Sequence, residues 1–175
     1  MLVALIIIVV IVAGILGIAS TKPDTFRFER KITINAPAES IFQLINNFHE
    51  WTKWSPYEKI DPSMSRTYSG PDSGVGAQYA WSGNAKAGAG SMEILESTPS
   101  SKILFRLEFS KPMKALNTTE FLLEPRDGAI QTTWAMYGKC PLMMKVFHLI
   151  LPMDKIMARD FDAGLANLKA AAENK

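Results

Sequence analysis

The chain carries few side chains that could act as a nucleophile, a general base or a metal ligand. Its 175 residues include one cysteine, Cys140, and two histidines, His49 and His148. A single cysteine excludes an intrachain disulfide, and these three residues do not have the spacing of a zinc site. The sequence shows no Ser-His-Asp set and no paired carboxylates at a useful spacing. We therefore predict no metal site, and we expect Cys140 to be a small, partly buried thiol.

The other ionisable candidates are badly placed for chemistry inside a cavity. Arg106, Glu108 and Glu120 lie opposite the most apolar strand positions or near strand ends. Glu93 alternates with apolar neighbours and is expected to point to solvent. His148 lies in an apolar stretch and could reach the mouth of a cavity, but a packed or exposed role is the simpler interpretation. The sequence therefore names no catalytic residue.

Charge and composition exclude some classes of partner. Nineteen Lys and Arg residues and 17 Asp and Glu residues give a formal net charge of +2, and the basic residues are scattered along the chain. A dedicated nucleic-acid surface would gather them, so no nucleic-acid partner is expected. No glycine-rich segment opens a helix as a phosphate loop would, and we expect no cofactor. A neutral or apolar ligand is compatible with this composition.

An uncharged apolar segment, Leu2–Ala19, differs sharply from the rest of the chain. As a helix it would span about 27 Å, close to the hydrocarbon thickness of a bilayer. We predict a single-pass transmembrane anchor over residues 1–21 and one domain over residues 22–175. A cleaved signal peptide is the alternative, because Ala19-Ser20 could serve as a cleavage site, but no basic residue precedes the apolar run.

Basic residues near the apolar segment bear on its orientation. Lys22, Arg27, Arg30 and Lys31 follow the segment closely, and only the α-amino group precedes it. The positive-inside rule therefore favours a cytoplasmic position for the domain. A periplasmic or extracellular position stays open, because anchors of this shape also lead domains outward.

Apolar patterns divide the domain into its elements. In residues 25–34, apolar and polar side chains alternate with the period of a half-buried strand. Pro37 then begins a short helical region, which Pro56 ends. Six further strand-length segments follow, separated by turn residues such as those at 126–128. No crossover helix separates these strands, so we predict an α+β fold with an antiparallel, meandering sheet.

A long amphipathic helix is predicted at the C-terminal end. Its apolar stripe is formed by Met153, Met157, Phe161, Leu165 and Leu168. A helix of about twenty residues is about 30 Å long, enough to cross a small sheet, so the stripe should be buried against the concave face of that sheet. Gly164 lies on the stripe, at a cost of roughly 0.5–1 kcal/mol relative to alanine. It either allows close packing against a bulky sheet residue or leaves room for a ligand.

Several stretches of the domain resemble a known superfamily. The segments "ITINAPAESIFQLINNFHEWTKWSP", "GVGAQYAWSGN", "TTWAMYG" and "MDKIMARDFDAGLANLK" are similar to START-like, birch-pollen-allergen-like (SRPBCC) proteins. Within this superfamily they resemble the bacterial subgroup described as polyketide cyclase/dehydrase and lipid transport, over residues 24–172. The resemblance implies the helix-grip fold, in which a curved antiparallel sheet of about seven strands wraps around a long C-terminal helix and a cavity lies between them. It does not choose a reaction or a ligand.

Inward strand positions and the helical stripe give a candidate cavity wall. We expect this wall to be formed by Tyr79, Trp81, Met92, Phe105, Trp134, Met136, Met157, Phe161 and Gly164. Such a lining suits a flat or chain-like apolar ligand held mainly by buried area. The alternative is that the same residues simply fill the core.

Three functions are compatible with these expectations. The first is a membrane-anchored protein that binds a hydrophobic small molecule or lipid without catalysis. The second is an enzyme of the cyclase or dehydrase type, which an ionisable side chain without a partner inside the cavity would favour. The third is a non-catalytic interaction module near the membrane with a collapsed cavity. The sequence leaves the oligomeric state open.

The apolar segment 142–151 is too short to span a bilayer. One interpretation is a lid helix, or the first turn of the long helix bent at Pro152. The other is a segment that touches the membrane surface, with Lys145 among the headgroups.

Overall fold

A curved, seven-stranded antiparallel sheet forms the centre of the protein in the computed structural model, which describes residues 1–174. The strands are β1 (Thr25–Ile34), β2 (Ser65–Ser69), β3 (Gln78–Ser82), β4 (Ala89–Thr98), β5 (Lys102–Lys111), β6 (Ala115–Arg126) and β7 (Ala129–Lys139). Their order in the sheet is β1-β7-β6-β5-β4-β3-β2, so β2 to β7 form a meander and β1 pairs with the last strand. The predicted α+β class and antiparallel meander are confirmed.

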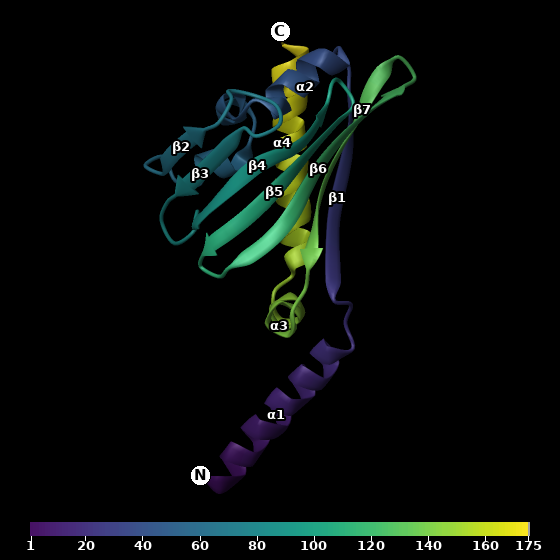
Figure 1. Ribbon diagram of the computed structural model, residues 1–175. Helices are drawn as coiled ribbons and strands as arrows, with labels where there is room; N and C mark the ends of the chain where they lie inside the picture. Colours follow the sequence, from purple (N-terminus) through teal and green to yellow (C-terminus); the bar gives the residue numbers. More distant parts are fainter. Residues whose placement is uncertain (175) are drawn as a thin grey trace.

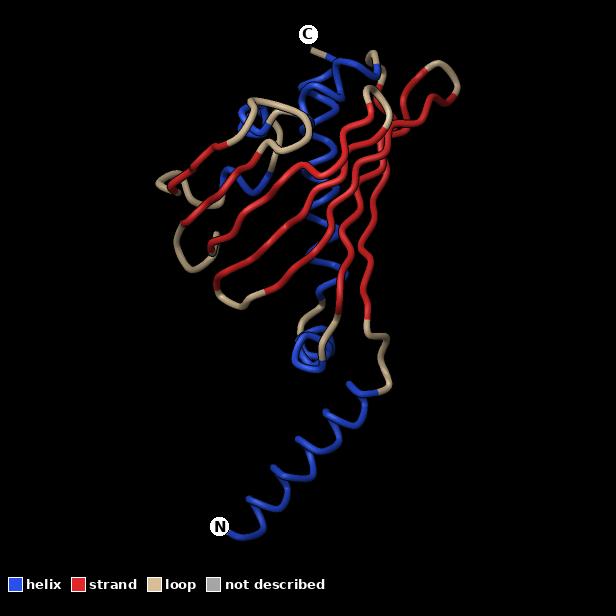
Figure 2. The backbone as a smooth tube through the Cα atoms, in the orientation of Figure 1, coloured by secondary structure: helices blue, strands red, loops and turns tan. Residues whose placement is uncertain are grey.

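Helices cover one face of this sheet and extend beyond one end of it. They are α1 (Leu2–Ser20), α2 (Ala38–Asn46), the 3-10 helices η1 (Phe48–Lys53) and η2 (Pro56–Lys59), α3 (Leu142–Ile150) and α4 (Met153–Glu173). Figure 1 shows α4 running along the concave face, with α2 near its C-terminal end. Figure 2 shows α1 and α3 at the opposite end, where β1 starts and β7 ends.

The strand register explains why one face of the sheet is apolar. Phe121 of β6 lies opposite Trp134 of β7, and Phe105 of β5 lies opposite Thr119 of β6. Because side chains alternate between faces along each strand, the large apolar residues of neighbouring strands gather on the concave side. Ile103, Phe105 and Phe121 are fully buried there.

The helices after β1, which are α2, η1 and η2, pack on this concave face beside α4. Pro37 precedes the first turn of α2, and Glu39 in that turn suits the positive end of the helix dipole. The indole of Trp51 donates a hydrogen bond to the Ile45 carbonyl, and the indole of Trp54 donates one to the Leu44 carbonyl, both at 2.8 Å. These bonds satisfy the polar ends of two buried rings and fix η1 against α2.

The stripe of α4 is buried as its period predicts. Phe161, Gly164, Leu165, Leu168 and Ala172 are its buried residues. Met157, one turn earlier than Phe161, and Met153, two turns earlier, are only partly buried. The helix is therefore tightly packed along its C-terminal part and more open at its start.

The N-terminal helix α1 stands apart from the sheet (Figure 1). It has 19 residues with a mean hydropathy of 3.3, which makes it long and apolar enough to cross a membrane. Ala19, near its end, is its one buried residue within the described chain. Residues 21–24 connect α1 to β1.

Candidate functional site

The concave side of the sheet is closed by aromatic packing around α4. The rings of Trp134 and Phe161 stack with centroids 4.2 Å apart and an angle of 3° between their planes. A Cβ at Gly164 would lie 2.5 Å from a carbon of the Trp134 ring and 3.0 Å from Cδ of Pro56. Gly164 therefore permits close packing of α4 on Trp134, and the space beside it is occupied by that ring.

The nine residues expected to line a cavity all lie on the concave side of the sheet or on the stripe of α4. Phe105, Trp134, Phe161 and Gly164 belong to the closely packed core. Tyr79 and Met92 are also almost fully buried, whereas Trp81, Met136 and Met157 are partly exposed. Their role in ligand binding stays a prediction.

Partly exposed apolar side chains continue this face toward the end of the sheet nearest α1. We call them the anchor-proximal concave surface: Phe28, Trp81, Phe109, Met136 and Met157. Phe28 lies opposite Met136 in the ladder between β1 and β7, and the ring of Trp81 meets Phe109 edge-on at 5.7 Å.

A glycine gives the indole of Trp81 its position on this surface. A Cβ at Gly90 would lie 2.6 Å from the Trp81 ring, so the ring rests directly on the backbone of β4. The indole nitrogen donates a hydrogen bond of 3.1 Å to the Ala87 carbonyl. Trp81 is thereby held in one place while part of its ring stays exposed.

Three buried polar side chains on the same side of the sheet carry an atom without a hydrogen-bond partner in residues 1–174: Asn117 Oδ1, Thr132 Oγ1 and Trp134 Nε1. Asn117 of β6 lies between Gly138 and Leu107 in the ladders and is 6% exposed. Its Oδ1 accepts no hydrogen bond from residues 1–174. Buried polar atoms are normally paired, and leaving one unpaired costs about 1–3 kcal/mol. Oδ1 packs against Gly138, where an added Cβ would lie 2.5 Å from it. Of the three residues, Asn117 is the one whose diagonal neighbours in the ladders are Phe109 and Met136, two members of the anchor-proximal concave surface.

A buried carboxylate, which the sequence reasoning missed, lies where η2 meets the sheet. Oε2 of Glu58 accepts a hydrogen bond of 2.6 Å from Nε of Arg66, and Oε1 accepts one of 2.6 Å from the Tyr79 hydroxyl. Burial, followed by the bond to Glu58, raises the pKa of the Tyr79 phenol above its usual range. The hydrogen bond to Glu58 also raises the pKa of Arg66.

The sequence did contain a signal for this cluster. Arg66 precedes Tyr68 by two residues on β2, so both side chains lie on the same face of that strand. Tyr68 lies opposite Tyr79, whose face is buried. An arginine at an inward position requires an acidic partner. The inward position of Arg66 becomes visible only once the pairing of β2 with β3 is known, so the sequence alone did not lead to Glu58.

The remaining ionisable candidates lie on the opposite side of the sheet or at the edge of this face. Glu93 pairs with Arg106, and Arg106 with Glu108, on the opposite side of the sheet. Cys140 is buried, and burial raises the pKa of its thiol. The ring of His148 meets the rings of Phe26 and Phe28 at about 6 Å, at the edge of the anchor-proximal concave surface.

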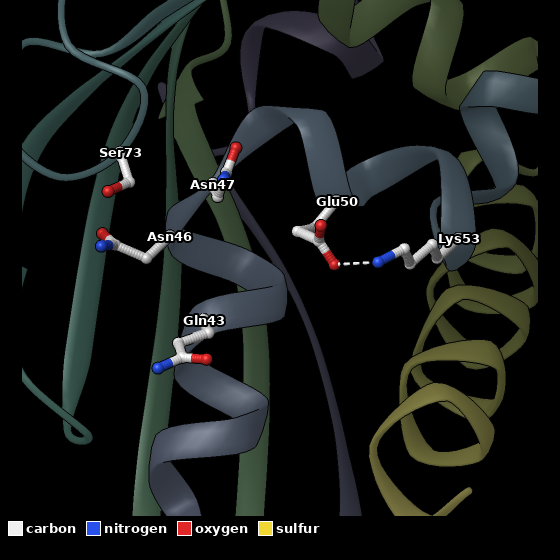
Figure 3. Close-up of a pocket in the computed structure, with 6 residues that line it drawn as sticks. All are labelled: Gln43, Asn46, Asn47, Glu50, Lys53 and Ser73. Carbon is white, nitrogen blue, oxygen red and sulfur yellow. Dashed lines mark hydrogen bonds and ion pairs between the residues drawn. The ribbon is translucent and has the colours of Figure 1, made fainter. Parts of the chain in front are cut away.

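A polar hollow lies elsewhere on the protein. It has a volume of about 430 Å³ and is lined by Gln43, Asn46, Asn47, Glu50, Lys53 and Ser73. Figure 3 shows these side chains on α2, η1 and the loop after β2, with Glu50 and Lys53 joined as an ion pair. Asn46 accepts a hydrogen bond from the Ser97 hydroxyl, and the Asn47 side chain caps η1. This hollow is not the apolar cavity that the sequence predicts.

Comparisons with solved structures agree on the fold. Protein CV1439 from Chromobacterium violaceum is 18% identical, with a TM-score of 0.59 over 87% of this chain and 99% of that chain. The di-domain ARO/CYC protein BexL from the BE-7585A biosynthetic pathway is 13% identical, with a TM-score of 0.64 over 89% of this chain and 52% of that one. Ara h 8.0201 is 14% identical, with a TM-score of 0.53 over 86% and 96%. No curated protein matches the chain.

One family matches the sequence itself. The family described as polyketide cyclase / dehydrase and lipid transport matches residues 25–173, from the first residue of β1 to the last residue of α4. The matched region contains the whole sheet, its covering helices and the anchor-proximal concave surface. The chain therefore belongs to the polyketide cyclase / dehydrase and lipid transport family, within the helix-grip (SRPBCC) superfamily.

Proposed function

We propose that this protein is a membrane-anchored binding protein that holds a hydrophobic small molecule or lipid against the anchor-proximal concave surface. The observation that carries the proposal is the combination of partly exposed apolar side chains with the unpaired, buried Oδ1 of Asn117 on the same face. Residues 1–21 form the anchor and residues 22–175 the binding domain.

The surface suits a ligand that is mostly apolar. Trp81, Phe109 and Met136 offer aromatic and flexible apolar area, and covering apolar area contributes about 25 cal/mol per Å². Methionine side chains adapt to varied shapes, which favours loose selectivity. Asn117 adds one acceptor, so the fitting molecule is a chain or flat ring system with a single hydroxyl or amide donor.

The anchor brings this surface close to a source of such molecules. Helix α1 has the length and hydropathy of a membrane span. It lies at the end of the domain where β1 starts and β7 ends (Figure 1), which is also the end where the apolar side chains are partly exposed. The family's description includes lipid transport, which supports a lipid or lipid-like ligand. The basic residues after α1 favour a cytoplasmic position of the domain, by the positive-inside rule.

An enzyme of the cyclase or dehydrase type is the second candidate, favoured by the buried Glu58 carboxylate beside Tyr79. Both carboxylate oxygens are engaged, one by Arg66 and one by Tyr79. A proton acceptor needs a lone pair that can reach the substrate, so these bonds favour a role in fixing η2 on the sheet. The third candidate, an interaction module, draws support from the closed packing around Trp134.

The test of binding is native mass spectrometry of the full chain, purified from its host membranes in mild detergent. The expected result is a co-purifying apolar molecule that denaturation releases. The Asn117→Leu variant should bind it five- to tenfold less, because one hydrogen bond to the ligand is lost, which is worth about 1 kcal/mol. The matched control is Thr118→Val, on the opposite face of the same strand, which should bind normally.

The same two variants separate a ligand role from a structural one. If Asn117 serves the ligand, Asn117→Leu should keep or raise the unfolding temperature, since it removes an unpaired buried amide. A stable protein from which no apolar molecule is ever released would overturn the proposal.

A further inference from the structure

Helix α3 turns its polar side chains toward the protein and most of its apolar side chains outward, the opposite of an ordinary surface helix. Its two polar residues, Lys145 and His148, face the protein, where Lys145 is 6% exposed and His148 contacts Phe26 and Phe28. Its outward side is apolar and exposed at Leu142, Met143, Phe147, Leu149 and Ile150, and the exposed Leu151 follows the helix. A helix facing water turns its charged residues outward, so this outward face is built for an apolar neighbour.

An ion pair fixes Lys145 in this inward position. Its Nζ lies 2.6 Å from Oδ1 of Asp24, and the Cys140 amide donates a hydrogen bond of 2.7 Å to the Asp24 carbonyl. The pairing with Lys145 lowers the pKa of Asp24. The expectation that Lys145 would meet lipid headgroups is wrong, because the link between α1 and β1 binds it instead. With the lysine turned inward, no charge interrupts the outward face of α3.

The same contacts place α3 beside the end of the anchor. Helices α1 and α3 contact each other, and Ala19 is completely buried where α1 ends. Figure 1 shows α3 between the sheet and the last turn of α1. Residues 21–24 can extend by only about 14 Å, so α3 cannot move far from the level at which α1 leaves a bilayer.

We propose that the outward face of α3 lies in the interfacial region of the same bilayer that α1 spans. The proposal rests on the anchor in the proposed function and adds a second membrane contact to it. Continuity with α1 identifies the occupant as lipid rather than a second protein, because the exposed apolar side chains of the two helices adjoin. Lys22, Lys139 and Lys155 flank the two helices in the sequence and are exposed, which suits anionic headgroups.

Two contacts orient the domain as well as tether it. A single helix allows the domain to rotate about residues 21–24, whereas α1 and α3 together hold the start of β1 and the end of β7 against the membrane. In this arrangement α3 lies between the bilayer and the anchor-proximal concave surface. An apolar molecule can then pass from the bilayer to that surface without crossing water.

The test uses the full chain in vesicles of phosphatidylcholine and phosphatidylglycerol, with Cys140→Ala as background and one new cysteine carrying an environment-sensitive dye. In Ile150→Cys, which replaces a side chain that is 63% exposed, spin-labelled lipids should quench the dye at least twofold. Ile8→Cys reports on α1 and should be quenched as well. Asp127→Cys, in the turn between β6 and β7 at the far end of the sheet, should not be quenched.

The pattern of quenching separates the two proposals. Quenching at residues 8 and 150 supports the seating of α3, and quenching at residue 8 alone overturns it while keeping the anchor. No quenching at residue 8 overturns the anchor itself. The unmodified chain gives an independent readout with a photoreactive lipid, which should label the peptide containing residues 142–151 and leave the peptide containing Asp127 unlabelled. Equal labelling of both peptides would also overturn the proposal.

Discussion

The distance between α4 and the sheet depends on one missing side chain. At Gly164, helix propensity alone favours alanine by about 1 kcal/mol. The Trp134 ring occupies the place of the Cβ, and it cannot move freely because it also stacks on Phe161. Contact with a rigid, buried ring outweighs the gain in propensity.

We therefore expect Gly164→Ala to lower the free energy of unfolding by about 1–2 kcal/mol, the usual cost of overpacking. Urea titration followed by tryptophan fluorescence measures this. The control is Ala166→Gly on the exposed side of α4, which reports the propensity difference alone. A more stable Gly164→Ala protein would show that α4 does not rest on Trp134.

Tyr79 should make stability depend on alkaline pH. Burial and the bond to Glu58 raise its pKa in the folded protein, whereas an unfolded tyrosine releases its proton near pH 10. Its contribution is therefore complete below about pH 10 and is lost as the pH rises above that value, because only the unfolded chain is then deprotonated.

The comparison is with Tyr79→Phe, which cannot titrate. We expect this variant to be less stable than the wild type by about 1–2 kcal/mol at pH 7, through loss of a hydrogen bond to a carboxylate. The difference should shrink between pH 10 and pH 11.5 in urea titrations. A difference that stays constant with pH would contradict the buried Tyr79–Glu58 bond.

Helix α3 shows why the face of a short element is hard to predict. The segment 142–151 was expected to be a lid or to touch a membrane, and its composition alone could not place Lys145. Only the return of the chain beside Asp24 turns that side chain inward. The strands were easier, because a period of two fixes which side chains share a face. Phe26, Phe28 and Ile32 were assigned together for this reason.

The ion pair between α3 and the link after α1 should respond unequally to removal of its two partners. Asp24→Asn leaves the Lys145 ammonium buried without a negative partner, whereas Lys145→Met leaves the exposed Asp24 carboxylate in water. We expect a clearly larger fall in unfolding temperature for Asp24→Asn, measured in the same detergent. Equal falls would indicate that Lys145 reaches water in solution.

At the scale of the whole molecule, the sequence predicts the fold but not how the interior is packed. The helix-grip fold was predictable because hairpins, one long amphipathic helix and the family-like segments all point to the same architecture. The candidate site was not, since the stripe of α4 predicts burial equally well against a ligand or against Trp134. Asn117 was also missed, because an asparagine in a strand gives no sign of being buried until its neighbours are known.

The domain should fold without α1. Side chains of α1 other than Ala19 are partly or fully exposed, and the family match starts at residue 25. We expect a chain of residues 22–175 to unfold cooperatively within a few degrees of the full chain, as measured by near-ultraviolet circular dichroism. Loss of the near-ultraviolet signal would show that α1 completes the core.

β1 lies at one edge of the sheet, with only four residues between it and α1. The β1 edges of two copies pair most strongly as antiparallel strands. Antiparallel pairing requires one copy to be inverted relative to the other along the strand direction. If α1 spans the membrane as proposed, neighbouring copies with the same topology share one orientation, so this antiparallel pairing is closed to them. The proposed anchor would thus prevent antiparallel pairing of neighbouring copies through β1.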